Sequence, residues 1–223
     1  MSKRDHISMS VVRRLPRYYR FLTELSKSGI TRISSKELSE KMGLTASQIR
    51  QDLNCFGGFG QQGYGYFVEQ LQKEIGNILG LSNRYSSILI GAGNLGRAVA
   101  THIYFHPIGF ELSAILDRDP ALIGTKINGI TVDDVKNIEK IYQTFHPKTA
   151  VLCVPKSAAP ELSKVLYNLG IKSYWNFSHY DISLAFPDVI VENVHLSDSL
   201  MTLCYRITAN NKPSPLSRSE SSN

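Results

Sequence analysis

The spacing of apolar positions along the chain changes near residue 80. In the first part they recur every three or four residues, which is the spacing of helices that bury one face. This spacing predicts helices over residues 16–28, 34–42, 45–54 and 68–79, bounded by glycines and by Ser or Thr residues that suit helix ends. We therefore predict a small helical domain over residues 1–80, in which residues 1–15 form a loose arm.

Beyond residue 80, short apolar runs alternate with helical segments. Runs at 87–90, 112–116, 149–154, 171–175 and 189–191, with a shorter one near 130–132, are typical of buried parallel strands. Helices are expected to begin near Gly96, Asp133 and Ser157. The alternation predicts an α/β domain over residues 81–209, a Rossmann fold whose doubly wound parallel sheet binds its ligand at the carboxyl ends of the strands.

The last predicted helix carries one apolar stripe, made by Leu196, Leu200, Leu203, Cys204 and Ile207. A helix this late in the chain packs either on its own domain or on a partner subunit. Residues 210–223 are rich in Ser, Pro and Asn, and we predict that they form a disordered tail.

A glycine-rich turn stands where the first strand of the second domain ends and a helix begins. It reads Gly91-Ala92-Gly93-Asn94-Leu95-Gly96, the Gly-x-Gly-x-x-Gly spacing of dinucleotide-binding turns. The first glycine allows a sharp turn, the second lets a pyrophosphate approach the backbone, and the third lets the helix pack closely on the strand. Free N–H groups at the helix N-terminus favour phosphate groups. The sequence therefore predicts a dinucleotide site that includes all six residues.

Further candidate cofactor residues follow the other strands. Asp117 lies 21 residues after Gly96 and ends the next apolar run, where a carboxylate accepts hydrogen bonds from an adenosine ribose. Arg118 is of the type that accommodates a 2′-phosphate, but the acid favours NAD over NADP. Two pairs at later strand ends are positioned to line the nicotinamide half, or are ordinary loop residues: Val154-Pro155 and Asn176-Phe177.

Two short helices in the first domain have the form of a helix-turn-helix, whose second helix enters the DNA major groove. Each helix begins with a predicted capping box, Ser34 with Glu37 and Thr45 with Gln48. On the second helix, side chains that meet base edges or phosphates face away from the apolar positions: Ser47, Arg50, Gln51 and Asn54. The glycine-dense, aromatic stretch 56–66 suits a β-hairpin and predicts a wing. A three-helix structural or partner-binding module is the alternative.

The charge of the chain is unevenly distributed. Residues 1–84 carry 13 Lys and Arg against 7 Asp and Glu, whereas residues 85–223 carry 12 of each, so the net charge of +6 belongs to the first part. Arginines gather where the N-terminal arm enters the first helix, at Arg13, Arg14, Arg17 and Arg20. This asymmetry indicates a polyanionic partner for one domain only.

Composition excludes several classes of protein. No apolar run approaches the length of a membrane span, and the charged N-terminus lacks a following signal region. Three cysteines without C-x-x-C spacing support neither a disulfide framework nor a metal site. We therefore predict a cytoplasmic protein without a metal.

Several segments of both domains, taken together, are specific to one family. They are Arg14-Leu15-Pro16-Arg17-Tyr18-Tyr19-Arg20, Ser34-Ser35-x-x-Leu38, Gln48-Ile49-Arg50-Gln51-Asp52-Leu53, Phe56-Gly57-x-Phe59-Gly60, Gly63-Tyr64-Gly65-Tyr66, Ile78-Leu79-Gly80, the glycine turn, Asp117-x-Asp119-Pro120 and Asn176-Phe177. On these segments the chain resembles the Rex family of bacterial redox-sensing repressors, to about Ala209.

The resemblance implies a homodimeric transcriptional repressor, not an enzyme, with a winged-helix domain, a Rossmann domain and a C-terminal helix swapped between subunits. It implies that NADH closes the dimer so that the two recognition helices no longer match the half-sites of a palindromic operator, while NAD⁺ is compatible with DNA binding. The expected contacts to double-stranded DNA are Arg13, Arg14, Arg17, Ser34, Ser35, Thr45, Ser47, Gln48, Arg50, Gln51, Asn54, Gln61, Gln62 and Tyr64.

Some positions depart from the family pattern. Gln51 and the pair Gln61-Gln62 replace basic residues, which predicts fewer phosphate contacts and a shallower salt dependence. The family's coupling residues match Arg20, His102 and His195 here, where the last two replace a Tyr and an Asp. We hypothesise that these histidines make the coupling weaker or pH-dependent.

Three alternatives stay open at this stage. An NAD-dependent dehydrogenase would need a catalytic histidine, but no His-Asp or Ser-x-x-x-Lys arrangement singles one out. A related Rossmann domain that binds coenzyme A or another nucleotide is the second alternative. The third is an NAD-binding winged-helix regulator with a weakened or altered redox response.

Overall fold

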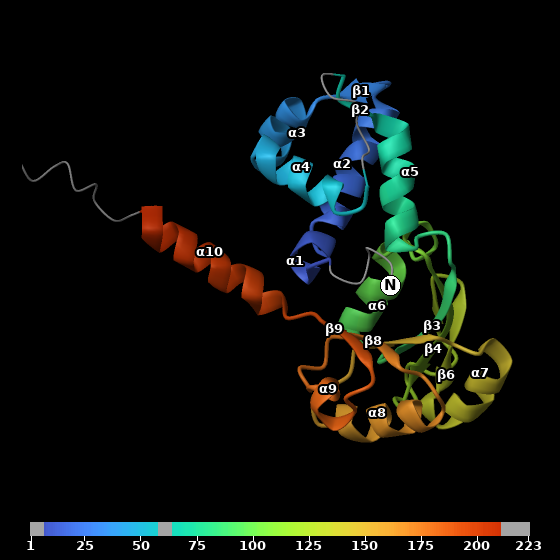
Figure 1. Cartoon of the computed structure of the whole chain (residues 1–223). Helices are drawn as coiled ribbons and strands as arrows, with labels where there is room; N and C mark the ends of the chain where they lie inside the picture. Colours follow the sequence, from blue (N-terminus) through green and yellow to red (C-terminus); the bar gives the residue numbers. More distant parts are fainter. Residues whose placement is uncertain (1–6, 58–63, 211–223) are drawn as a thin grey trace, which may run out of the picture. The chain divides into compact units, whose positions relative to one another are not determined.

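The computed structural model describes residues 7–57 and 64–210, and the chain divides into two compact units (Figure 1). Unit 1 runs to Arg84 and takes in His106–Gly109, while unit 2 consists of Tyr85–Phe105 and the chain from Phe110 onward. Each unit buries apolar side chains of its own, one cluster in unit 1 and two in unit 2.

Unit 1 is a small helical domain with one two-stranded sheet. Its elements are α1 (Met9–Val12), α2 (Leu15–Lys27), β1 (Arg32–Ile33), α3 (Ser35–Met42), α4 (Ala46–Asn54), β2 (Tyr66–Phe67) and α5 (Val68–Leu79). Helices α2 and α5 pack against each other, as do α3 and α4, and β1 pairs with β2 in antiparallel fashion. The helix-turn-helix form predicted from the sequence is therefore present.

Capping chemistry explains where α3 and α4 begin. The Ser34 hydroxyl accepts a hydrogen bond from the Glu37 amide, and the Glu37 carboxylate accepts one from the Ser34 amide, which completes the predicted capping box. At α4 only half of the predicted box forms. The Thr45 hydroxyl accepts from the Gln48 amide, but the Gln48 side chain donates to Asp52 instead of reaching back.

Unit 2 is built on a seven-stranded sheet in the order β5-β6-β4-β3-β7-β8-β9. The strands are β3 (Tyr85–Ile90), β4 (Phe110–Asp117), β5 (Lys126–Ile127), β6 (Ile130–Asp134), β7 (Thr149–Leu152), β8 (Ser173–Asn176) and β9 (Ile190–Asn193). All neighbours pair in parallel except β5 with β6. The chain moves outward on one side of β3 and returns to β7 on the other, so β3 and β7 flank a topological switch point, where ligands bind in such sheets.

Helices cover both faces of this sheet (Figure 1). They are α6 (Asn94–His102), α7 (Ile138–Phe145), α8 (Ala159–Asn168) and α9 (Ile182–Ala185), and a 3₁₀ turn at Val135–Asn137 precedes α7. The last helix, α10 (Leu196–Asn210), extends away from the sheet and buries no residue, and the 3₁₀ turn at His106–Ile108 belongs to unit 1. Ile88 and Ile90 belong to the cluster that holds α7, α8 and α9, and Leu89 belongs to the cluster that holds α6. Alternate side chains of one strand thus serve opposite layers.

The structure corrects several predicted boundaries. Residues 9–12 of the predicted loose arm are helical, and the predicted strand at 149–154 ends at Leu152. The helical segment predicted to begin near Asp133 begins at Val135 with a 3₁₀ turn that Asp134 caps, because Asp133 and Asp134 still pair in β6, and the α-helix α7 starts at Ile138. The short elements β5 and α9 were not predicted, and α10 continues through Asn210. The strand at the end of the predicted wing, β2, pairs with β1 at residues 32–33 and not with a strand inside the stretch 56–66. Residues 58–63 of that stretch and the predicted tail from 211 lie outside the described residues.

Within the described ranges, no helix is long and apolar enough to cross a membrane. No group of three or more His, Cys, Asp or Glu side chains there is arranged to hold a metal ion.

Candidate functional site

The glycine turn between β3 and α6 is shaped by two close backbone approaches. Gly91 has a φ of +99°, and a Cβ there would lie 2.4 Å from the Cys153 carbonyl oxygen. A Cβ on Gly96 would lie 1.7 Å from the Gly91 carbonyl oxygen. A Cβ on Gly93, by contrast, would meet no heavy atom within 4 Å. The turn is therefore tight on its protein side and open above the N-terminus of α6, where no side chain caps the free N–H groups.

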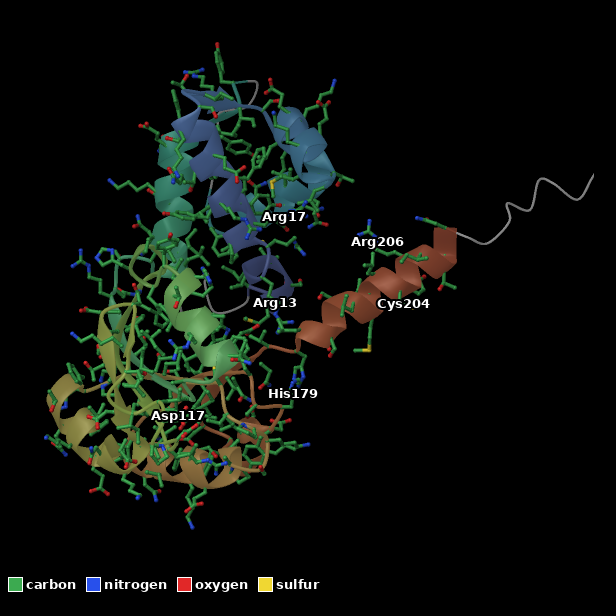
Figure 2. All side chains as sticks on the ribbon, turned by 180° about the vertical axis from the view of Figure 1, so that it is seen from behind. Arg13, Arg17, Asp117, His179, Cys204 and Arg206 are labelled. Atoms are coloured by element: carbon green, nitrogen blue, oxygen red, sulfur yellow. The ribbon has the colours of Figure 1, made fainter. Side chains whose placement is uncertain are left out.

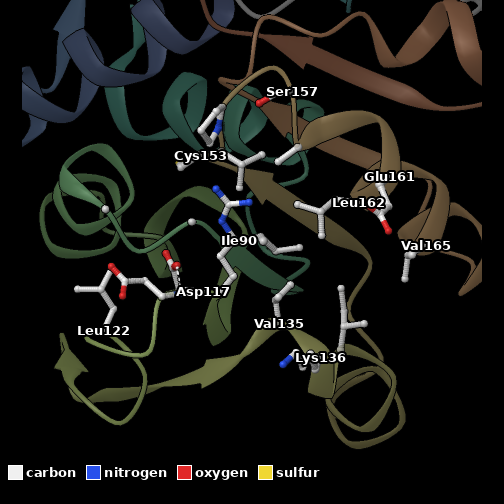
Figure 3. Close-up of a pocket in the computed structure, with 18 of the residues that line it drawn as sticks. Ile90, Asp117, Leu122, Val135, Lys136, Cys153, Ser157, Glu161, Leu162 and Val165 are labelled. Atoms are coloured by element: carbon white, nitrogen blue, oxygen red, sulfur yellow. Dashed lines mark hydrogen bonds between the residues drawn. The ribbon is translucent and has the colours of Figure 1, made fainter.

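A cavity of about 700 Å³ opens beside this turn (Figure 3). That volume lies within the usual range for sites that bind small ligands. Six of the predicted cofactor residues line it: Gly91, Gly93, Asp117, Arg118, Val154 and Pro155. The structure thus brings residues from the ends of β3, β4 and β7 to one crevice.

Asp117 joins the glycine turn to the end of β4. Its Oδ2 accepts a hydrogen bond of 2.5 Å from the Ala92 amide, and its Oδ1 accepts one of 2.9 Å from the Asp119 amide. Each carboxylate oxygen keeps a second acceptor position, which a ribose hydroxyl can use. The acid therefore holds the turn in place and still faces the cavity.

Sequence reasoning missed most of the remaining cavity wall. These residues are Ile90, Asp119, Leu122, Val135, Lys136, Ile138, Glu139, Cys153, Ser157, Ala158, Glu161, Leu162 and Val165. Many follow the carboxyl ends of β6 and β7, a position that could have indicated them. The wall contains apolar side chains, which suit a planar nucleobase, and it carries four carboxylates and two cations. This negative balance disfavours an additional phosphate on the ribose.

Cys153 contributes the only thiol among the residues that line the cavity. Burial raises the pKa of its thiol to about 12. The group stays protonated at neutral pH and is a poor nucleophile, because the thiolate is the reactive form.

Asn176 and Phe177 are not among the residues that line this cavity. Asn176 is buried, donates from Nδ2 to the Tyr180 carbonyl and to Asn193 Oδ1, and accepts at Oδ1 from the Ser178 amide and hydroxyl. Phe177 is buried and packs edge-to-face with Trp175. Both therefore shape the loop after β8. Ala92, Asn94, Leu95 and Gly96 likewise form the turn without lining the cavity.

The outer face of α4 carries the predicted base-reading side chains. Ser47, Arg50, Gln51 and Asn54 are exposed, while Ile49 and Leu53 are buried in the core of unit 1. Arg50 donates from Nη1 to the Ser35 hydroxyl at 3.1 Å, so this guanidinium lies along the start of α3. The face formed by these four side chains is polar and carries one cation, Arg50, and side chains of these types contact base edges and phosphates.

The inner face of α4 holds a buried carboxylate with three side-chain donors. Asp52 accepts hydrogen bonds from Arg14, Tyr18 and Gln48, at distances from 2.6 to 2.8 Å. Burial alone would raise the pKa of Asp52, but these hydrogen bonds and the guanidinium charge outweigh it and hold the pKa below its ordinary value. Arg14 and Gln48, both predicted DNA ligands, thus have partners inside unit 1.

The other predicted DNA ligands differ in their surroundings. Arg17 donates from Nη2 to the Met42 carbonyl, whereas the Arg13 side chain makes no hydrogen bond or ion pair within the described parts of the chain. Figure 2 labels both arginines. Ser34 and Thr45 cap α3 and α4, and the Tyr64 side chain is exposed. Gln61 and Gln62 lie outside the described residues.

The three predicted coupling residues belong to different units. Arg20 lies on α2 in unit 1, while His102 ends α6 and His195 precedes α10 in unit 2. The His195 ring lies against His179, with the two Nδ1 atoms 2.7 Å apart. One of these rings donates and the other accepts, so the pair joins the loop after β8 to the start of α10.

Helix α10 has no buried residue, although its sequence is apolar along one stripe. Leu196, Leu200, Leu203 and Ile207 are each at least half exposed. An apolar stripe of this length on one chain needs a covering surface.

Known protein families match both the first and the second part of the chain. Residues 6–54 match a family model described as a putative DNA-binding protein N-terminus, and residues 82–180 match one described as a CoA binding domain. The chain is 55% identical over 207 residues to the redox-sensing transcriptional repressor Rex of Caldanaerobacter subterraneus, covering 93% of this chain and 92% of that protein. It is 52% identical over 212 residues to the Rex protein of Clostridium acetobutylicum, covering 95% of this chain and 99% of the relative.

Two solved structures extend this similarity to the fold. One is RSP in complex with β-NAD⁺ and operator DNA, with a TM-score of 0.83, 52% identity, and coverage of 92% of this chain and 94% of the other. The second is RSP in complex with β-NADH, with a TM-score of 0.83, 49% identity, and coverage of 92% and 96%. A further structure of the same protein is described as a Rex-family repressor.

Proposed function

The chain belongs to the Rex family of redox-sensing transcriptional repressors, and from this premise we propose that it binds an operator through α4 and releases it when NADH occupies the crevice beside β3. It is a DNA-binding regulator that senses the NADH/NAD⁺ state, and it is not an enzyme. The redox nucleotide is its ligand, and duplex DNA is its macromolecular partner.

The observation that carries this function is the presence of both sites on one chain. Unit 2 holds an open glycine turn and an acid at the switch point, and unit 1 holds a helix-turn-helix with a cationic outer face. The relatives match the chain along nearly all of its length, so neither site is left out of the similarity. In solved relatives the same architecture carries NAD⁺ with operator DNA, or NADH.

For the nucleotide, we assign roles by position. The backbone from Gly91 to Gly96 receives the pyrophosphate, Asp117 accepts from the adenosine ribose, and Arg118 lies beside it. The apolar wall from Val135, Leu162 and Val165 receives the adenine ring. Val154, Pro155, Asn176 and Phe177 belong to the nicotinamide side, the last two by shaping the loop after β8.

For the duplex, α4 reads base edges and the flanking groups contact phosphates. Arg50, Gln51 and Asn54 present donors and acceptors that match base edges. Exposed Arg13, whose guanidinium has no partner among the described residues, supplies a cation, and exposed Tyr64 extends the surface. Gln61 and Gln62 stay predicted DNA ligands. The shortage of cations in the wing predicts a shallower salt dependence than a basic wing would give.

A dehydrogenase is disfavoured by the crevice itself. No histidine is among the residues that line it, and its one thiol stays protonated. Coenzyme A, named in the description of one matching family model, is less compatible with Asp117, because the 3′-phosphate of its ribose would meet an acidic wall.

We further propose that the working form is a homodimer in which α10 of each chain packs on the other. A palindromic operator needs two recognition helices, and the exposed apolar stripe of α10 offers a surface that a second copy of the chain can cover. The cytoplasm, where DNA and the NAD pool share a compartment, is the place of action that this function implies.

A fluorescence-anisotropy titration tests the function directly. Palindromic duplexes are selected from a random pool with the full-length chain and titrated with NADH, with NAD⁺ and without nucleotide. We expect tight binding without nucleotide and with NAD⁺, and release by NADH. Equal affinity in all three conditions would contradict redox sensing, and no preference for any duplex would contradict operator binding.

Coupling through Arg20, His102 and His195 is proposed to depend on pH. The His179–His195 hydrogen bond needs one unprotonated Nδ1, so it is lost when both rings are protonated. The NADH titration is therefore repeated at pH 6 and pH 8. We expect the efficiency with which NADH releases the duplex to differ between the two. Strong release that is the same at both would contradict the hypothesis.

A further inference from the structure

Asp52 is a carboxylate inside the recognition helix. It lies on the inner face of α4 and is 0% exposed, between the buried Ile49 and Leu53. Arg14 donates to it twice, from Nε at 2.6 Å and from Nη2 at 2.7 Å, and the Tyr18 hydroxyl and Gln48 Nε2 each donate at 2.8 Å. Four hydrogen bonds fill the acceptor capacity of the two oxygens.

The donors come from two separate parts of unit 1. Gln48 lies one turn earlier on α4, whereas Tyr18 lies on α2 and Arg14 is the N-cap of α2. A guanidinium that meets a carboxylate with two parallel bonds fixes both distance and rotation. The network therefore sets how α4 is rotated about its own axis against α2, and with it the direction in which Arg50 and Asn54 point.

A second arginine of α2 acts on the neighbouring helix. Arg17 donates from Nη2 to the carbonyl of Met42, in the last turn of α3. Arg14 and Arg17, three residues apart, thus hold α4 and α3 respectively. The Arg13 guanidinium has neither a hydrogen bond nor an ion pair among the described residues, so these neighbouring arginines are not equivalent.

We propose that Asp52 and Arg14 are positioning residues of the operator interface, and that Arg14 acts through Asp52 instead of through a DNA phosphate. This inference rests on the proposed function, in which α4 reads the duplex. Without the network α4 stays helical, because its apolar contacts remain, but its outer face no longer matches the spacing of base edges.

Two substitutions separate positioning from phosphate contact. If Arg14 contacted a phosphate, Arg14→Lys would keep the cation and most of the affinity. Asp52→Asn would then remove an anion from the interface, free the guanidinium and strengthen binding. If the pair positions α4, both substitutions weaken operator binding, because Lys cannot donate in a fork and Asn offers one acceptor oxygen and no charge.

The experiment measures the affinity of the full-length chain for its selected palindromic duplex and for a shuffled duplex, as a function of salt. For Arg14→Lys and Asp52→Asn we expect the affinity for the palindrome to fall about tenfold or more, while the affinity for the shuffled duplex changes less than about twofold. The slope of log affinity against log salt should stay unchanged. Arg13→Gln should lower the slope by about 0.9 for each phosphate that the chain no longer neutralises, hence by about 1.8 in a dimer. Arg32→Lys, the same chemical change elsewhere in unit 1, should leave the palindrome affinity within about twofold.

A milder variant protects the test against misfolding. Tyr18→Phe removes one donor to Asp52 with no change in charge, and we expect about threefold weaker palindrome binding at an unchanged slope. Thermal unfolding and NADH binding establish that each variant is folded at the assay temperature; if Asp52→Asn is not, Arg14→Lys and Tyr18→Phe decide.

Distinct results overturn the two proposals. Wild-type affinity in Arg14→Lys, tighter binding by Asp52→Asn, or a slope for Arg14→Gln that falls as much as that for Arg13→Gln would overturn the positioning role alone. A wild-type chain that prefers no duplex would overturn the proposed function itself.

Discussion

At the scale of single residues, this protein places opposite demands on neighbouring glycines. Gly96 has no room for a methyl group because the Gly91 carbonyl would lie 1.7 Å from it, whereas Gly93 faces open space. The lack of a side chain is thus required for packing at Gly96, and at Gly93 it leaves the space above the turn open.

The first prediction follows from this contrast. Gly93→Val should keep the thermal stability of unit 2 near that of the wild type but weaken NADH binding by about 100-fold or more, since the side chain enters the space for the pyrophosphate. Gly96→Ala should instead lower stability, by about 2 kcal/mol or more, because a backbone carbonyl must move. Differential scanning calorimetry and NADH fluorescence distinguish the two. Loss of stability in Gly93→Val would show that the open space has a structural use.

The second prediction concerns the acid limb of stability. The folded-state pKa of Asp52 is lowered, so its carboxylate stabilises unit 1 fully above the unfolded pKa of about 4 and loses that contribution as pH falls through the folded value. Asp52→Asn should cost about 3 kcal/mol at pH 7, as broken buried pairs do. Urea unfolding of both proteins between pH 7 and pH 2 should show this difference shrinking only below about pH 4. A difference that is constant with pH would contradict the role of the charge.

At the scale of elements, periodicity and a terminal glycine placed one helix correctly, whereas a capping signal placed the start of another too early. Helix α5 runs from Val68 to Leu79 and stops at Gly80, whose φ is +71°, as its periodicity and glycine predict. The start of α7 was placed too early because Asp133 resembles an N-cap, yet it pairs with Leu116 in the sheet. Sheet pairing moved the cap to Asp134, whose side chain accepts from the Lys136 amide at the 3₁₀ turn before α7.

The third prediction tests α10. Leu200→Asp places a charge in the exposed stripe and should convert the dimer to a monomer in sedimentation-velocity experiments, with about 100-fold or greater loss of affinity for a palindrome because a single recognition helix remains. Ser199→Asp, a charge in the first turn where the helix dipole tolerates it, is the matched control. Dimers of Leu200→Asp that bind the palindrome normally would exclude α10 as the subunit contact.

At the scale of the whole molecule, charge and ligand chemistry are divided between the units. The net positive charge belongs to residues 1–84, while the balanced remainder forms the sheet and its crevice. A cationic surface raises the affinity for any DNA duplex, whereas a surface of balanced charge does not attract the duplex.

The fourth prediction follows from this division. Arg50→Ala should weaken palindrome binding by about 30-fold or more, because the guanidinium of each of two copies no longer reaches a base edge or phosphate, and should leave the NADH affinity within about twofold. Anisotropy with labelled duplex and NADH fluorescence measure the two affinities on one sample. A parallel loss of NADH binding would show that Arg50 acts through the fold.

The sequence by itself determined the two-part organisation, the glycine turn with its acid, and the exposed face of α4, because periodicity, turn geometry and charge are local properties of the chain. Only the tertiary structure decided which arginines are free. Arg13, Arg14 and Arg17 look alike in the sequence, but Arg14 meets an acid 38 residues away and Arg17 meets the end of α3. It also decided that Asn176 and Phe177 shape a loop, and that Val135, Leu162 and Val165 wall the crevice. Such pairings depend on how distant elements pack, and no local pattern encodes the direction in which a side chain finally points.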